Sequence, residues 1–296
     1  MVVWTELRRK ISNIVYMNSF INTFLNKFCA QKGIVNRSIC VNRLSYLSGN
    51  SYQSFLAKLY SFILKQGIPS NLIDDFEMVA SSGDSLILLF PNLALKLFSP
   101  RLDQQNENES IQKELIHSKI FSPYVVNVID SLFLPDIAVI AYEKVLPLTK
   151  NTLLKFRSKE VIILIKQIGE ALDFLMSQGY EHGDPGHSNI AFSPRLGRFI
   201  LIDLEDIKQK EPSQNLDLRR FMEDLEIQFK GDAENVDPKT KAIIKSLLEK
   251  LNEWYKPKEE EITFLGKKKK RTRFISEYHP GDLATFLRNL DTIEAT

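Results

Sequence analysis

The segment "YEHGDPGHSNIAF" at residues 180–192 gathers polar side chains that could do chemistry in one short, turn-rich stretch. Asp184 and Asn189 stand in the spacing D-x-x-x-x-N, and Asp203 follows after the apolar run "FILI". Phosphoryl transfer needs such a trio: one carboxylate orients the attacking hydroxyl, while an amide oxygen and a second carboxylate hold Mg²⁺ against the nucleotide phosphates. The spacing therefore favours a phosphoryl-transfer site over a polar loop with no functional role.

Residues 1–72 are expected to form a helical N-terminal extension. Apolar residues recur near helical spacing over residues 4–32 and again over 51–66, which predicts two helices. Pro69 cannot continue a helix, so "GIPSN" ends the second one. We interpret both apolar stripes as packing faces. The stripe of the first helix includes Ile14, Val15, Phe20, Phe24 and Phe28.

Residues 73–145 are expected to form a small, mostly β unit. The runs "FEMVASSGDSLILLF" and "LALKLF" predict three short strands with turns at "SSGDS" and "PN". A helix is predicted over residues 106–120, and "YVVNVIDSLFL" and "IAVIAYEKV" predict two more strands. The unit would then contain five strands and one inserted helix.

Residues 146–296 are expected to be mostly helical. A helix is predicted over residues 161–177 and should end near Gly179. The run "RFILIDLEDI" alternates like a buried strand, and the chain from about Leu216 is predicted to be largely helical with a basic C-terminal tail. The predicted fold class is therefore α+β.

The composition is typical of an ordinary globular protein, with 44% hydrophobic and 26% charged residues among 296 and a formal net charge of +2. This balance requires neither a nucleic-acid partner nor a membrane partner. No apolar run is long enough to span a membrane, and the N-terminus lacks the apolar core of a signal peptide. Cys29 and Cys40 show no C-x-x-C pattern, so we expect two reduced structural thiols, no zinc site and a cytoplasmic protein.

Two motifs resemble the protein-kinase-like superfamily, and the resemblance covers about residues 76–255. "HGDPGHSN" resembles the kinase catalytic loop H-R-D-x-x-x-x-N, or the H-G-D form of aminoglycoside-type phosphotransferases. "IDLE" resembles the metal-binding D-F-G element, or the I-D-x-E of those small-molecule kinases. Either motif alone is weak, but the pair at this spacing is fairly specific. The resemblance implies a bilobal kinase-like fold, with a small antiparallel β N-lobe and a mostly helical C-lobe that bind ATP and Mg²⁺ between them.

The resemblance also implies roles for individual residues. Asp184 would orient the nucleophile, and Asn189 and Asp203 would hold Mg²⁺. Lys96 in "LALKLF" would contact the α- and β-phosphates, with Glu114 as its ion-pair partner. The rival candidates for that partner are Glu109 and Glu107.

Further positions follow from the same resemblance. Gly83 of "SSGDS" would cover the phosphates, although the usual G-x-G-x-x-G is reduced to one glycine here. The backbone of Glu143 and Val145, in the hinge "YEKV", would face adenine. Asp217 would brace the catalytic loop from a helix, whereas His182 is interpreted as a structural histidine, hydrogen-bonded within the loop.

Four departures from the family pattern indicate an atypical, minimal kinase. Gly183 replaces the arginine that reads a phosphorylated activation loop, so control of that kind is not expected. Glu205 takes the place of the D-F-G glycine, and the short stretch at residues 203–217 lacks A-P-E. Gly186 replaces the loop lysine, and the neighbouring His187 either stabilises the transferring phosphoryl group or takes no part.

Two classes of phosphate acceptor are compatible with the sequence, a protein and a hydroxylated small molecule. No large helical insertion follows the hinge, so we favour Ser/Thr of a protein substrate and a stand-alone kinase, including one delivered into a host cell. The alternatives are a small-molecule kinase of the aminoglycoside or choline kinase type acting on a hydroxylated metabolite, a pseudokinase, and a non-catalytic binding module.

The basic run at residues 267–273 is interpreted as a solvated loop. Its functional alternatives are an acidic partner or nuclear targeting. Aromatic residues are not interleaved with the lysines, which disfavours a nucleic-acid partner.

Overall fold

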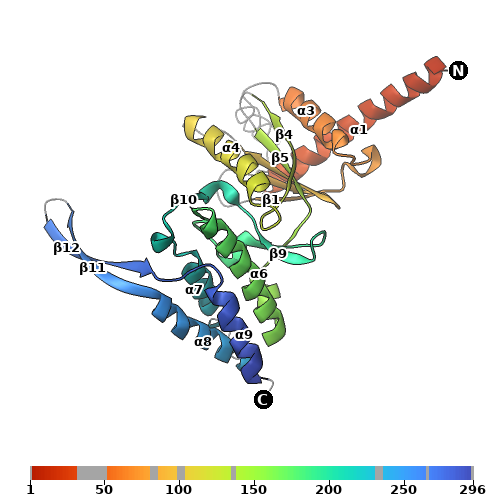
Figure 1. Ribbon diagram of the computed structural model, residues 1–296. Coiled ribbons are helices and arrows are strands. Elements are labelled where there is room, and N and C mark those ends of the chain that lie inside the picture. The colour runs from red at the N-terminus through yellow and green to blue at the C-terminus, as the bar shows by residue number, and fades with distance from the viewer. Residues whose placement is uncertain are drawn as a thin grey trace. The chain divides into compact units, whose positions relative to one another are not determined.

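The computed structural model describes residues 2–31, 52–80, 86–98, 104–134, 138–230, 236–264 and 267–294. Helices and small sheets alternate along the chain, which confirms the predicted α+β class (Figure 1). The chain divides into two compact units, Met1–Ile111 with Val128–Lys144 and Gln112–Asn127 with Val145–Thr296. Helix α4 (Gln104–Ile120) begins in the first unit and ends in the second.

The first unit contains a five-stranded antiparallel sheet in the order β1-β2-β3-β5-β4. Its strands are β1 (Glu77–Ala80), β2 (Leu86–Leu89), β3 (Leu93–Phe98), β4 (Val128–Phe133) and β5 (Ala138–Glu143). Every residue of β5 is buried, as its largely apolar sequence favours. The five predicted strands are confirmed, while the predicted "SSGDS" turn with Gly83 lies outside the described residues.

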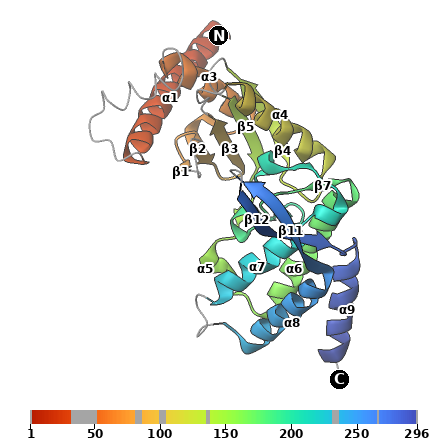
Figure 2. The same cartoon turned by 90° about the vertical axis from the view of Figure 1, so that its left-hand side faces the viewer.

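Two helices of the first unit, α1 (Val2–Gln31) and α3 (Tyr52–Lys65), share its hydrophobic core with the sheet (Figure 2). Phe20, Phe24 and Phe28 recur every four residues of α1 and are buried. The rings of Phe20 and Phe24 lie 5.9 and 6.4 Å from that of Phe76, which leads into β1. The apolar stripe of α1 is therefore a packing face over this part of the helix, as predicted.

The cysteine prediction is wrong at Cys29. This residue, near the end of α1, is disulfide-bonded, whereas the sequence predicted two reduced thiols. Cys40 lies outside the described residues. Spacing along the chain does not reveal which cysteines approach one another in the fold, so the pattern held no sign of the bond.

Helix α6 (Ser158–Ser177) is the longest helix of the second unit, and its apolar face is buried. It begins three residues before the predicted start, where the Arg157 backbone N–H donates to Glu160 Oε2 at 2.6 Å. It ends before Gly179, whose φ of 78° is readily adopted only by glycine.

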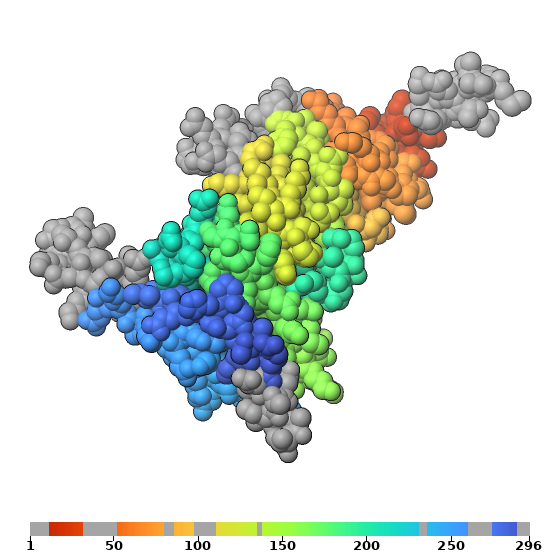
Figure 3. Space-filling view, viewed as in Figure 1, coloured from red at the N-terminus to blue at the C-terminus, as the bar shows by residue number. Residues whose placement is uncertain are grey.

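Helix α9 (Asp282–Glu294) packs against α6 at a glycine, and the two lie side by side in the space-filling view (Figure 3). A Cβ on Gly169 of α6 would collide with Leu283 Cδ2 of α9, so the glycine allows the two helices to pack closely. The unit also contains α5 (Lys150–Leu153), α7 (Asp217–Lys230) and α8 (Pro238–Trp254). The helical character predicted after Leu216 is thus confirmed for α7, α8 and α9.

Short strands flank the polar segment of the second unit. Strand β7 (Tyr180–Glu181) pairs with β10 (Lys208–Gln209), and β6 (Leu146–Pro147), β8 (Ile190–Ser193) and β9 (Arg198–Leu201) form a sheet in the order β6-β8-β9. The 3-10 turns nearby are η2 (His187–Asn189), η3 (Leu204–Asp206) and η4 (Pro212–Gln214). The run "RFILIDLEDI" is a strand only as far as Leu201, because the backbone turns at Asp203.

A hairpin of two ten-residue strands, β11 (Tyr255–Phe264) and β12 (Lys267–Ser276), projects from the helices of the second unit (Figure 1). It carries the basic run, so the prediction of a helical tail with a basic loop is wrong here. Glu260 and Glu261 are the register partners of Arg271 and Lys270. Glu and Lys have low strand propensity, so neither propensity nor apolar periodicity predicts these two strands.

No helix in the described part of the chain combines the length and apolar character that crossing a membrane requires.

Candidate active site

The polar loop at His182–Asn189 is fixed at both ends by strand pairing. Glu181 of β7, before the loop, is the register partner of Lys208, and Ile190 of β8, after it, is the register partner of Leu201. The Ile202 N–H donates to Asn189 O at 2.9 Å, and Ile202 O lies 3.1 Å from His182 Nε2. The loop is therefore joined directly to the residue before Asp203. Within this unit the structure brings the predicted trio of Asp184, Asn189 and Asp203 into one region.

Asp184 and Asn189 contact each other across the loop. Asn189 Nδ2 donates to Asp184 Oδ2 at 2.8 Å and to Asp184 O at 2.9 Å. Because the amide nitrogen is engaged in this way, the other end of the Asn189 side chain, Oδ1, is the atom left for a cation. The Asp184 side chain is exposed, whereas the next residue, Pro185, is buried and has its own φ fixed by its ring.

Asp203 has a left-handed backbone, with φ of 62°. Among the described residues it is the one non-glycine with positive φ, a conformation that costs about 1–2 kcal/mol. Its neighbours on both sides are held: Ile202 by the loop, and Leu204 by burial and by a 3.2 Å contact between its carbonyl oxygen and His117 Nδ1. Backbone strain maintained by such surroundings is concentrated at functional sites.

Asp217 braces the loop from the first residue of α7, as predicted. Its carboxylate accepts hydrogen bonds from the backbone N–H of His182 at 2.5 Å and of Gly183 at 3.2 Å. Arg220, one turn further along α7, donates from Nη1 to Gly183 O at 3.1 Å. Burial raises the pKa of the Asp217 carboxyl above its usual value, while His182 and the two backbone donors act in the lowering direction.

The two histidines of the loop have different surroundings. His182 is fully buried with Nε2 on Ile202 O, which confirms the predicted structural role, with a strand-end carbonyl as its partner instead of a loop atom. His187 contacts Asp224 of α7 through both its backbone N–H and its ring Nδ1. Sequence reasoning missed Asp224. The available signal was that residues 217, 220 and 224 share one face of a helix at i, i+3 and i+7.

The predicted phosphate-binding residues are divided between the two units. Lys96 lies in β3, with Ile87 of β2 and Ile140 of β5 as register partners, and it is 8% exposed. Glu114 lies in α4, in the second unit, and is 1% exposed. Such burial of charged groups is expected where they have ionic or hydrogen-bonding partners. The pairing of Lys96 with Glu114 stays a prediction, and the side chains of Glu107 and Glu109 lie outside the described residues.

The predicted hinge coincides with the division of the chain into two units. Glu143 ends β5 opposite Leu93 and is 7% exposed. The first unit ends at Lys144 and the second resumes at Val145. The predicted contact of this backbone with adenine stays a prediction.

The number and type of the available protein ligands determine which metal ion this region could bind. In the described portions of the chain, no three His, Cys, Asp or Glu side chains form a group that could bind a metal. Asn189 and Asp203 would supply only two protein ligands. They fit Mg²⁺, which takes oxygen ligands and commonly completes its shell with nucleotide phosphates and water.

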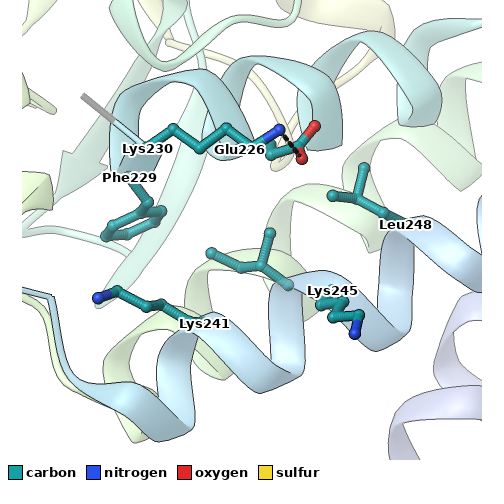
Figure 4. A pocket seen from close by; sticks show the side chains of 7 residues that line it. Glu226, Phe229, Lys230, Lys241, Lys245 and Leu248 are labelled. Atoms are coloured by element: carbon teal, nitrogen blue, oxygen red, sulfur yellow. Dashed lines mark ion pairs between the residues drawn. The ribbon is translucent and has the colours of Figure 1, made fainter. Parts of the chain in front are cut away.

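A pocket of about 290 Å³ in the second unit lies between α7 and α8 (Figure 4). Its lining residues are Glu226, Phe229, Lys230, Lys241, Ile244, Lys245 and Leu248. Two of these already pair with each other, since Lys230 Nζ lies 2.5 Å from Glu226 Oε1. None of the predicted site residues lines this pocket.

Comparison with protein-family models and with curated proteins found no match to this chain. We therefore infer the function from the site residues themselves.

Proposed function

We propose that the chain is an ATP- and Mg²⁺-dependent phosphotransferase of bilobal, kinase-like fold that moves the γ-phosphoryl group to a hydroxyl. The observation that best supports this is the joining of the His182–Asn189 loop to the segment that carries Asp203, with its left-handed backbone. This arrangement brings together one solvent-exposed carboxylate, that of Asp184, and two residues with oxygen atoms that can bind a metal, Asn189 and Asp203, in one region of the second unit.

In this proposal each site residue has a role, and the hydrogen bonds between Asn189 and Asp184 support two of these roles. Asp184 Oδ2 accepts from Asn189, so Oδ1 is left to accept the proton of the acceptor hydroxyl. Asn189 Oδ1 and the Asp203 carboxylate hold Mg²⁺, which would neutralise charge on the phosphates. Lys96 binds the α- and β-phosphates, Glu114 positions Lys96, and the backbone of Glu143 and Val145 contacts adenine. In this chemistry the protein contributes mainly positioning and electrostatic stabilisation.

The short segment after Asp203 supports an atypical kinase with no activation-loop switch. Between Asp203 and Asp217 the chain forms η3, β10 and η4, and β10 pairs back onto β7. Gly183, where regulated kinases carry an arginine, has φ of 92°, and a Cβ there would lie 3.0 Å from Asp206 O. A side chain at position 183 is therefore unfavourable, and the glycine there provides no cationic group that could bind a phosphorylated activation loop.

The favoured acceptor is Ser or Thr of a protein. Only the four-residue helix α5 lies between β6 and α6, which leaves little chain for the helical insertion that holds a metabolite in aminoglycoside-type or choline kinases. A small-molecule acceptor and a non-catalytic pseudokinase are the outcomes that the test must separate from it.

The test is Asp203→Asn, assayed with labelled ATP, Mg²⁺ and a generic acceptor protein. Asparagine tolerates the left-handed backbone about as well as aspartate, so the substitution removes charge without adding strain. We expect transfer to fall at least about 100-fold, while the free energy of unfolding changes by less than about 0.5 kcal/mol. The matched control is Asp206→Asn, an exposed carboxylate of the same segment, which should retain activity.

Three results would contradict parts of the proposal. Full transfer by Asp203→Asn would remove Asp203 from the metal site. Transfer that requires an added sugar, amine or alcohol metabolite would replace the protein acceptor by a small molecule. Binding of ATP by the wild-type chain without transfer to any acceptor would identify a pseudokinase.

A further inference from the structure

We propose that the pocket between α7 and α8 binds a small amphiphilic anion, a molecule with an apolar body and one carboxylate or similar group. Asp184, Asn189 and Asp203 do not line this pocket. It can therefore bind such a ligand whether or not the chain transfers phosphate.

The inner wall of the pocket is apolar. Phe229 of α7 and Ile244 of α8 are each 4% exposed, and Leu248 of α8 is half-buried. In Figure 4 the Phe229 ring points toward α8 and the Leu248 side chain points toward α7, so both lie between the two helices. The space of about 290 Å³ beside these side chains can take an apolar group, which would gain free energy by leaving water.

Each wall of the pocket is one face of a helix. On α7 the lining residues are Glu226, Phe229 and Lys230, and on α8 they are Lys241, Ile244, Lys245 and Leu248. These positions recur at three- and four-residue steps, which places them on the same side of their helix. Both helices belong to the second unit, so the pocket is complete within that unit.

The rim of the pocket is cationic. Lys230, Lys241 and Lys245 are exposed, and Glu226 is the one acidic residue among the seven that line the pocket. The lining residues therefore carry a formal charge of +2, even though Glu226 already pairs with Lys230. Lysine has a flexible apolar stem and a charged head, so it can cover an apolar ligand and still bind an anion at the mouth.

The charges next to the pocket leave this attraction in place. Lys245 Nζ lies 4.0 Å from Glu249 Oε1, and the two side chains are 79% and 67% exposed. Solvent screens an ion pair as exposed as this one, so it contributes little. A ligand anion can therefore compete with Glu249 for Lys245.

The dimensions of the pocket favour a small molecule over a segment of another protein. A helix that binds in a groove inserts apolar side chains spaced over two or more turns. Here the apolar lining consists of Phe229, Ile244 and Leu248, and the volume is close to the lower end, about 300 Å³, of small-molecule pockets. Charge then selects among small molecules, because a cation would be repelled by the lysines and a neutral molecule would gain nothing from them.

The test is calorimetric titration of the full chain with octanoate and with its neutral isostere octanamide. We expect one octanoate to bind per chain, with a Kd at least about 10-fold lower than that of octanamide, because only the carboxylate forms charged hydrogen bonds with lysine. Added salt should weaken the binding of octanoate and affect octanamide far less. Each carbon added from hexanoate to octanoate should lower the Kd about 4-fold, as expected for a buried methylene group.

Charge variants locate the anionic group of the ligand. Lys241→Gln with Lys245→Gln should raise the Kd for octanoate at least about 10-fold and leave that for octanamide within about 2-fold of wild type. The matched control is Lys239→Gln with Lys250→Gln, an equal charge change on α8 at residues that do not line the pocket. This control should retain the wild-type affinity for octanoate.

Methyl NMR locates the apolar body of the ligand. Octanoate should shift the methyl resonances of Ile244 and Leu248 and leave that of Ile163, an exposed residue of α6, unchanged. The inference would be overturned by a lack of saturable octanoate binding, by equal affinity for octanamide, by full affinity in the Lys241→Gln, Lys245→Gln variant, or by shifts confined to other methyl groups. None of these results depends on ATP or on phosphate transfer, so they leave the test of Asp203 unaffected.

Discussion

At the residue scale, Asp203 and Gly183 show how backbone conformation selects residue type at the candidate site. Asp203 occupies the left-handed region, which Asp and Asn adopt more readily than other side chains. Gly183 also has positive φ and lies against the Asp206 carbonyl oxygen. The glycine at position 183 is therefore favoured by its backbone conformation and by the close approach of η3, whatever reaction the loop supports.

His117 is a second residue whose environment determines its behaviour. It is 6% exposed in α4, and its ring centroid lies 5.5 Å from that of Phe121 and 5.9 Å from that of Tyr180. Burial lowers the pKa of His117 below its ordinary value of 6.5, and the charges of Lys113 and His182 act in the same direction, against a smaller raising effect of the Leu204 carbonyl. The folded chain therefore favours the neutral ring.

This lowered pKa predicts a loss of stability in acid. The pKa of His117 is lower in the folded state than in the unfolded state, so its contribution is present above about pH 6.5 and is lost as the pH falls through the folded-state pKa. We expect the unfolding midpoint to decrease on acidification from pH 7.5, and His117→Asn, whose Nδ2 can replace ring Nδ1 as a donor, to weaken that dependence. Thermal unfolding at a series of pH values measures it, with exposed His279→Asn as the control. Equal slopes for wild type and His117→Asn would contradict the assignment.

The closeness of Asp184, Asn189 and Asp203 was predictable because these residues belong to neighbouring segments of the sequence. Asp184 and Asn189 occupy one loop, and Asp203 follows the strand that pairs with the strand after that loop. Asp224 was not predictable in the same way, because its contact with His187 joins residues 37 positions apart. Helical spacing shows which α7 residues share a face, but it does not show which loop that face meets.

At the element scale, α1 is bound to the first unit by its aromatic residues. Phe24 is fully buried, and its ring lies 6.0, 6.2 and 6.4 Å from those of Phe20, Phe28 and Phe76. Towards its N-terminus the same helix carries Ile14, which is 55% exposed. The C-terminal half of α1 therefore contributes far more to the core than the exposed Ile14 and Val15 before it.

A pair of alanine substitutions tests this division of α1. Phe24→Ala should lower the free energy of unfolding of the first unit by about 3–5 kcal/mol, because it removes a large buried ring and leaves a cavity. Ile14→Ala should change it by less than about 1 kcal/mol, since the side chain is already more than half exposed. Denaturant unfolding followed by circular dichroism measures both. Similar losses for the two variants would show that the aromatic cluster does not anchor the helix.

Elements with strong apolar periodicity were predicted from the sequence, and the charge-rich hairpin was not. The stripes of α1, α3 and α6 and the five apolar strands of the first unit follow hydrophobic spacing. The hairpin β11–β12 does not, because its middle is rich in Glu, Lys and Arg, which have low strand propensity. In β9 the apolar alternation continues past Leu201, but the left-handed turn at Asp203 ends the strand.

At the scale of the whole molecule, the charges are concentrated in segments rather than evenly mixed. The formal net charge is only +2, yet six of the seven residues from Lys267 to Arg273 are basic. The acidic residues Glu259–Glu261 lie on the neighbouring strand, in register with Thr272, Arg271 and Lys270. The distal part, from Ile262 to Lys269, has no acidic residue and therefore keeps an excess of positive charge.

The hairpin also bears on self-association of the protein. Within the described residues β11 and β12 form a two-stranded sheet, so each strand has an outer edge with no neighbouring strand. Such an edge can template strand addition by a second copy, and lysines on it oppose this by repulsion. Lys268→Gln with Lys270→Gln should therefore cause concentration-dependent self-association in sedimentation experiments, whereas Lys239→Gln with Lys245→Gln on α8, an equal charge change, should not. Wild-type chains should associate only when high salt screens the repulsion, and a Gln variant that stays monomeric at every concentration would show that the lysines do not guard the edge. On this account the lysine run keeps neighbouring copies of the protein apart, whether or not it also meets a partner.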